Sequence, residues 1–162
     1  MKRIIITVVV LFSILLGANA QEYRLYKTQN YHNQLRLNTR TGRVEQIQDD
    51  GQSWQIVFDL EPQEEYTNRF RLYETQNMWT FIELDTFTGR LWQVQYSVKG
   101  AEYRTFFTIN QKYLAIPENK SIFTIQPLTS MFQYYLMNEY TGEMWKFQWS
   151  TKGDDYRWIE KM

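Results

Sequence analysis

Apolar residues gather in two short runs around a polar turn between residues 78 and 96, where the chain reads MWTFIELDTFTGRLWQVQY. Aromatic and branched residues in runs of this length are typical of β-strands, so the stretch predicts a β-hairpin. Gly89 is placed to adopt the left-handed conformation that closes the turn after Asp85. No segment shows an apolar period of 3.6 residues long enough for an ordinary helix.

The hairpin belongs to a unit that occurs three times along the chain. Its turn recurs around Gly42, Gly89 and Gly142, which are separated by 47 and 53 residues, and the strings YRLYKTQN and FRLYETQN precede the first two hairpins. Repeats of about this length, with several short strands each, argue against helical repeat architectures. The four strands of the first unit are expected near 23–27, 32–37, 43–48 and 54–60.

The sequence therefore predicts one all-β domain over residues 21–162. It should consist of three four-stranded antiparallel repeats in a pseudo-threefold arrangement, at about 21–60, 68–109 and 121–162. Two closed forms fit this pattern: three propeller-like blades around an axis, which we favour, and a β-trefoil.

Two registers are possible for the central hairpin. A four-residue loop over 86–89 pairs Leu84 with Leu91, whereas a three-residue loop over 87–89 pairs Leu84 with Trp92. We adopt the three-residue loop, because it separates apolar from polar side chains. Its apolar face would hold Ile82, Leu84, Trp92, Val94 and Tyr96, and its polar face would hold Glu83, Gln93 and Gln95.

Under this register the outward positions differ between the repeats. The second and third repeats carry aromatic residues where the first is polar, namely Trp79, Phe81, Phe132 and Tyr134. These residues form either a second core layer between repeats, since large apolar side chains are usually buried, or a contact surface for a ligand. We take them as candidate binding residues. Amide side chains offer both donors and acceptors, and those assigned to the same site are Gln93, Gln95 and Gln148.

Residues 1–20 are expected to form a secretory signal peptide. A basic start precedes an apolar run over residues 4–16, and Ala18-Asn19-Ala20 is a small-x-small cleavage site before Gln21. The run is shorter than the ~20 apolar residues of a membrane anchor. We therefore expect a periplasmic or secreted protein without an integral membrane segment once the signal is removed.

The composition argues against several classes of function. After removal of the signal, 16 basic side chains remain against 18 acidic ones, with both signs scattered, so no electrostatic footprint for nucleic acid is present. The chain has no cysteine and one histidine, His32, which does not support His/Cys zinc sites or histidine-activated nucleophiles. A glycosidase carboxylate pair drawn from distant strands stays open. We expect no enzymatic activity, no cofactor and no metal.

The segment Leu84-Asp85-x-x-Thr88-Gly89-Arg90-x-Trp92 resembles the blade motif of quinoprotein-like (PQQ-type) β-propellers. In that family an Asp-x-x-Thr-Gly-Lys/Arg turn is followed by a tryptophan. The third repeat carries a weaker version from Asn138 to Trp145, and the first has Glu45 at the tryptophan position. Here the tryptophan comes one position earlier than in the family, and the chain is too short for the many blades of its enzymes. The resemblance implies the strand-turn-strand geometry and no cofactor-binding residue.

An exported all-β repeat protein with 17% aromatic residues and no catalytic set is most simply a binding module. We favour a protein partner, because Tyr and Trp recur as binding hot spots. An immunity or inhibitor protein that neutralises a toxin in the same compartment suits a small exported frame with variable outer positions. The alternatives are a carbohydrate-binding module, since sugar rings stack on exposed aromatic side chains, and a structural envelope protein.

Overall fold

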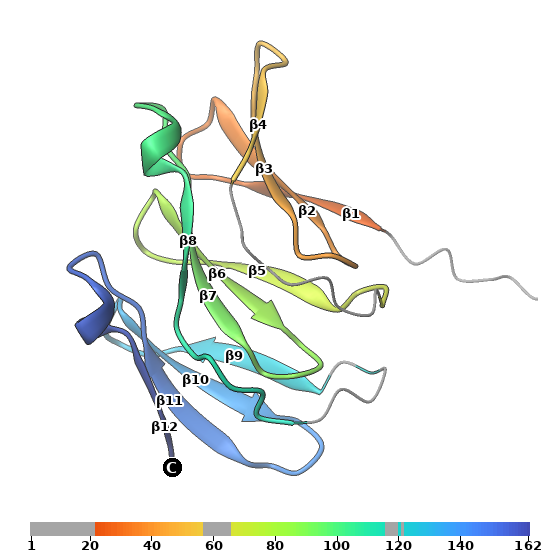
Figure 1. The fold of residues 1–162 in the computed structure, drawn as a ribbon, viewed down its shortest axis with the longest axis vertical. Helices are drawn as coiled ribbons and strands as arrows, with labels where there is room; N and C mark the ends of the chain where they lie inside the picture. The colour runs from red at the N-terminus through yellow and green to blue at the C-terminus, as the bar shows by residue number, and fades with distance from the viewer. Residues whose placement is uncertain (1–21, 57–65, 116–119, 121) are drawn as a thin grey trace, which may run out of the picture.

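The computed structural model describes residues 22–56, 66–115, 120 and 122–162. The predicted signal peptide and residues 57–60 of the predicted fourth strand lie outside this part. Within it the chain forms three four-stranded antiparallel sheets, each built from consecutive strands (Figure 1). The all-β fold and its three repeats are therefore confirmed.

Each sheet is a simple meander. The first contains β1 (Tyr23–Lys27), β2 (Asn33–Asn38), β3 (Val44–Gln48) and β4 (Ser53–Gln55). The second contains β5 (Phe70–Glu74), β6 (Thr80–Asp85), β7 (Leu91–Gln95) and β8 (Thr105–Thr108), with the 3₁₀ helix η1 (Ala101–Tyr103) before β8. The third contains β9 (Phe123–Pro127), β10 (Gln133–Asn138), β11 (Met144–Gln148) and β12 (Trp158–Lys161), with η2 (Asp154–Tyr156) before β12.

The sheets are stacked face to face, with the second sheet between the other two (Figure 1). One face of the second sheet, which carries Phe81 and Trp92, shares a buried cluster with Leu35 of the first sheet. The opposite face, which carries Ile82, shares a buried cluster with Leu136 of the third sheet. None of the described sheets closes on itself, so neither the propeller-like nor the trefoil arrangement is confirmed.

The register predicted for the central hairpin is wrong. Leu84 pairs with Leu91, which is the register of the four-residue loop over 86–89. A hydrogen bond of 2.9 Å from the backbone N–H of Gly89 to the carbonyl of Asp85 closes this loop. The apolar residues of the two strands therefore do not share one face.

The middle position of the second sheet explains the error. Ile82 and Leu84 face the third sheet, whereas Trp92 and Val94 face the first. Both faces are buried, and all six residues of β6 are shielded from solvent. A prediction that sorts apolar from polar side chains fails for such a sheet, because it assumes that one face meets water.

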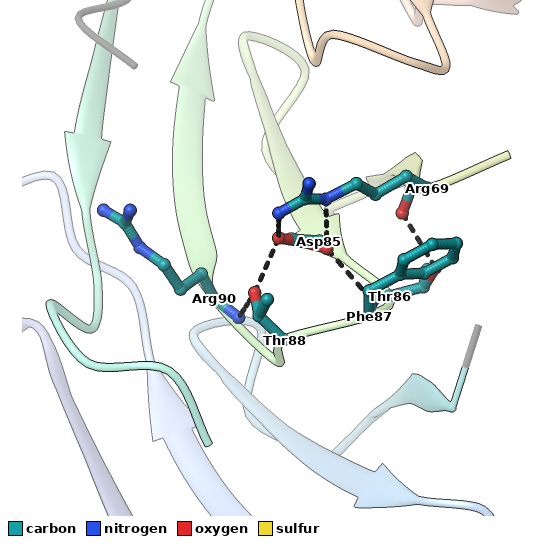
Figure 2. Close-up of polar contacts among 6 residues, drawn as sticks. All are labelled: Arg69, Asp85, Thr86, Phe87, Thr88 and Arg90. Atoms are coloured by element: carbon teal, nitrogen blue, oxygen red, sulfur yellow. Dashed lines mark hydrogen bonds and ion pairs between the residues drawn. The ribbon is translucent and has the colours of Figure 1, made fainter. Parts of the chain in front are cut away.

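An Asn or Asp residue caps each hairpin turn. The side-chain oxygens of Asn38 and Asn138 accept backbone hydrogen bonds from the residues two and three positions further on. Asp85 has the same place in the second sheet, and it also forms a bidentate ion pair with Arg69 at 3.1 and 2.7 Å (Figure 2). Both side chains are only 1% exposed. The hydroxyl of Thr88 donates to the same carboxylate at 2.6 Å.

A glutamine connects each sheet to the next. The side-chain oxygen of Gln46 in the first sheet accepts hydrogen bonds from the second sheet, from the backbone of Ser97 and from Nε of Arg104. In the same way, Gln93 in the second sheet accepts bonds from the third sheet, from Ser150 and Arg157. These bonds fix how far each sheet slides over its neighbour.

The third sheet lacks this connection on its outer face. Lys146 stands where the first two sheets have Gln46 and Gln93, and it pairs across the strands with Glu160. A lysine cannot accept the hydrogen bond that an arginine of a further sheet would donate. The outer face of the third sheet therefore does not repeat the glutamine connection of the first two sheets.

Candidate binding site

The strands of the three sheets begin and end at two opposite sides of the stack, and these two sides differ in construction. The turns that contain Gly42, Gly89 and Gly142 lie on one side, on the right in Figure 1, and the 3₁₀ helices η1 and η2 lie on the other. Two neighbouring hollows open on the side with the 3₁₀ helices, where the second strand of a sheet begins and the third strand ends.

The first hollow, which we name the aromatic hollow, has a volume of about 260 Å³. The half-buried ring of Trp79 lies 5.3 Å from the buried ring of Tyr96, which donates a hydrogen bond to the carbonyl of Met78. Burial raises the pKa of Tyr96, which keeps its hydroxyl as a donor. Tyr103 at 46% exposure and Val98 at 47% stand at the rim. The remaining lining residues are Asn77, Thr80, Gln95, Ser97, Lys99 and Thr151.

The second hollow, which we name the acidic hollow, has a volume of about 460 Å³. Nδ1 of His32 lies 3.1 Å from the carboxylate of Asp49, and both side chains are exposed. Asp50 adds a second carboxylate. Val98 lines both hollows, which are therefore adjacent, and we name the two hollows together the end groove. The remaining lining residues are Asn30, Asn33 and Gln48.

The two hollows occupy equivalent positions of consecutive sheets. Trp79 and Tyr96 of the second sheet stand where the first sheet has His32 and Asp49. In the third sheet the corresponding pair is Phe132 and Trp149, with ring centres 5.0 Å apart. The backbone positions are repeated in each sheet, whereas their side chains change from a histidine and an aspartate in the first sheet to aromatic pairs in the second and third.

Of the predicted aromatic residues, Trp79 is the one that lines the aromatic hollow, and Tyr134 borders a separate hollow next to Met131. Phe81 is 2% exposed between the first two sheets, and Tyr134 is 3% exposed and packs among residues shared by the second and third sheets. These two belong to the inter-sheet core, which was the other interpretation of the pattern. Phe132 is half-buried against Trp149.

The glutamines that were predicted to bind a ligand make hydrogen bonds within the fold. Gln93 is buried in the connection to the third sheet. The side-chain amide of Gln95 donates to the carbonyl of Tyr103 at 3.0 Å, and Gln148 donates to the carbonyl of Tyr156 at the same distance. Gln95 thus contributes to the aromatic hollow by holding the backbone at the end of η1, from which Tyr103 projects.

The sequence analysis did not assign Val98, Lys99 or Tyr103 to the binding site. They lie in the connection between the third and fourth strands of the second sheet, which forms η1. The corresponding connection of the first sheet, over residues 49–52, is shorter and has no such helix. This difference in length between repeats was the available signal, because an insertion on a repeated frame commonly carries binding residues.

The most perturbed carboxyl lies in the core and not in the end groove. Glu83 is fully buried between the first two sheets, and its carboxyl oxygens have no hydrogen-bond partner among the described residues. Burial, with the charge of Asp85 as a second cause, raises its pKa well above the ordinary value of 4.5. A Cβ atom on Gly42 would lie 2.8 Å from this carboxyl, so the turn of the first sheet covers it.

The described part of the chain brings together no group of three or more His, Cys, Asp or Glu side chains that could hold a metal ion. It also contains no helix long and apolar enough to cross a membrane. No protein family, no curated protein and no solved structure matches the chain. The chemistry of the end groove is therefore the basis for a functional proposal.

Proposed function

We propose that the protein is an exported, non-enzymatic binding protein that recognises another protein through the end groove. The observation that carries the proposal is the aromatic hollow, where Trp79 and Tyr103 border a depression with Val98 at its rim. Aromatic side chains next to a pocket are the usual energetic centre of protein interfaces. The sheets themselves serve, in this proposal, as propeller-like blades in an open row.

The rigidity of the groove supports this function. Trp79 packs on Tyr96, whose hydroxyl is fixed to the backbone of Met78. Gln95 holds the end of η1 and thereby Tyr103. A site whose side chains are already ordered loses little conformational entropy when a partner binds, which favours tight binding. A small exported protein with such a site fits an immunity or inhibitor protein that neutralises a toxin or enzyme in the same compartment.

Affinity capture with matched baits tests the proposal. Immobilised residues 21–162 are exposed to the secreted and periplasmic fraction of the source cell. Tyr103→Ala removes an exposed ring from the aromatic hollow. Tyr140→Ala removes a ring that is 78% exposed on the opposite side of the stack, among the hairpin turns. We expect a stoichiometric partner on the unaltered bait and on Tyr140→Ala, and its loss on Tyr103→Ala. Equal retention by all three baits, or no partner at all, would contradict the proposal.

Carbohydrate binding is the second candidate, and the lining of the aromatic hollow favours it. Trp79 and Tyr103 could stack on sugar rings, while Asn77 and Lys99 supply hydrogen-bonding groups beside them. A panel of soluble glycans should then quench the tryptophan fluorescence of the unaltered protein, and Tyr103→Ala should weaken the response. Unchanged fluorescence with every glycan would leave the protein partner as the sole proposal.

A further inference from the structure

We propose that the end groove binds an extended, proline-rich segment of the partner, which places a proline in the aromatic hollow and a basic side chain in the acidic hollow. This inference rests on the proposed function and specifies the chemistry that the groove recognises. It follows from the spacing of the two hollows, from the groups that line them and from the charge difference between them.

The spacing comes from the stacking of the sheets. The hollows occupy equivalent positions of the first and second sheets and share Val98 as a wall. Packed sheets lie ~10 Å apart, so equivalent positions recur at about that distance. A polyproline II helix completes a turn of three residues in ~9 Å, so its residues i and i+3 face the same side at nearly this interval.

Other backbone conformations match the interval less well. A β-strand rises ~3.3 Å per residue and turns successive side chains to opposite faces, so two residues three positions apart point in opposite directions. An α-helix rises 5.4 Å per turn and meets the interval only after about two turns, or seven residues. The spacing of the two hollows therefore favours a ligand whose side chains point in the same direction every three residues.

The aromatic hollow suits a proline. Aromatic grooves are the known docking surface for polyproline II segments, whose backbone carbonyls are free of internal hydrogen bonds. The indole N–H of Trp79 makes no hydrogen bond to any residue in the described part of the chain, so it is available to such a carbonyl. The hydroxyl of Tyr96, the partner ring of Trp79, is already engaged, because it donates to the carbonyl of Met78. The indole of Trp149, at the position of Tyr96 in the third sheet, likewise donates to the carbonyl of Met131.

The acidic hollow suits a basic side chain. Asp49 and Asp50 lie there with His32, and none of the residues that line this hollow is a lysine or arginine. Lys99 lines the aromatic hollow instead, where it disfavours a second cation. The charges of the groove therefore fix the order of the ligand, with the proline in one hollow and the cation in the next.

Fluorescence anisotropy with synthetic peptides tests this assignment. The probe is a labelled twelve-residue proline-rich peptide that carries one arginine three positions from a proline, made with the arginine on either side. The first control peptide replaces the prolines with glycine and serine, and the second replaces the arginine with glutamate. We expect at least one arginine probe to bind at least about tenfold more tightly than both controls.

Variants assign the binding to the two hollows. Tyr103→Ala should weaken binding of the probe about tenfold, and Tyr140→Ala on the opposite side should leave it unchanged. The double change Asp49→Asn and Asp50→Asn should remove the preference for arginine over glutamate and reduce the dependence on salt, because it removes the charges that attract the cation. Equal binding of the glycine-serine peptide, or binding that Tyr103→Ala does not affect, would overturn the inference.

The result also separates this inference from the proposed function. If a partner is captured in a manner that depends on Tyr103 but the proline-rich probes do not bind, the groove recognises another protein chemistry and the inference fails alone. If neither a partner nor a probe binds, both fail.

Discussion

The buried ion pair between Arg69 and Asp85 allows a sharp test of how the repeats are built. Arg69→Ile leaves the carboxylate of Asp85, which is 1% exposed, without its bidentate partner. Breaking a buried pair in this way costs about 3–5 kcal/mol, because one charge stays buried without compensation. With a urea m-value of about 2 kcal/mol/M, the unfolding midpoint should fall by about 2 M.

The third repeat supplies the compensating change. Ile122 and Asn138 occupy the places of Arg69 and Asp85, and the asparagine keeps the turn hydrogen bonds without a charge. The double variant Arg69→Ile and Asp85→Asn should therefore recover at least about 2 kcal/mol of the loss, since replacing both members of a buried pair is often neutral. Urea unfolding followed by tryptophan fluorescence measures both variants. A double variant as unstable as Arg69→Ile would refute the equivalence of these positions.

Three further changes test the core. Because burial raises the pKa of Glu83 above 4.5, the folded protein keeps a proton that the unfolded chain releases, and the free energy of unfolding should fall with rising pH by up to about 1.4 kcal/mol per unit above that value. Glu83→Gln should remove this fall. In urea unfolding, the free energy of unfolding of the variant should therefore rise relative to that of the unaltered protein between about pH 5 and pH 7, and a difference that does not change with pH would argue against this prediction. Gly89→Ala should destabilise more than Gly142→Ala although both glycines have φ of +74°, because only the first would bring a new Cβ within 3.0 Å of a phenylalanine ring; thermal unfolding with equal midpoints would contradict this. Gln93→Lys would bury a cation beside Arg157 and should lower the free energy of unfolding by about 3 kcal/mol. A calorimetric stability equal to that of the unaltered protein would show that the hydrogen bond between Gln93 and Arg157 does not stabilise the stacking of the sheets.

The strands and the hairpins could be predicted from sequence because they depend on local chemistry. Short apolar runs around an Asx-x-x-Thr-Gly turn specify a hairpin wherever they occur. The strand β2 lies within a residue of its expected place, and the same turn joins β6 to β7 and β10 to β11. The repeat then extends the assignment from one hairpin to three sheets.

The stacking could not be predicted in the same way, because it depends on which sheet becomes the middle one. Glu83 and Gln93 are polar residues that lie in the core, so polarity pointed to the wrong register. The change from Gln46 and Gln93 to Lys146 distinguishes the third sheet from the other two, and its meaning becomes readable only when the hydrogen-bond partners of the glutamines are known.

The candidate site was predictable only in part. Trp79 is an aromatic residue where the first repeat has His32, and this difference between repeats pointed to the groove. Phe81 lies two residues further along the chain, within β6, and is buried between the first two sheets, whereas Trp79 precedes the strand and only packs against the edge of that cluster. Tyr103 could not be assigned from the pattern, since its position depends on η1 and on the amide of Gln95.

The most direct test of the central claim is the affinity of the captured partner for two single variants, measured by isothermal titration calorimetry. Tyr103 and Tyr140 are both exposed tyrosines, and they lie on opposite sides of the stack. If the end groove is the binding surface, Tyr103→Ala should weaken binding by at least about 1.4 kcal/mol, which is tenfold, as expected for a hot-spot residue, while Tyr140→Ala binds as the unaltered protein does. Equal affinities for the two variants would contradict the account.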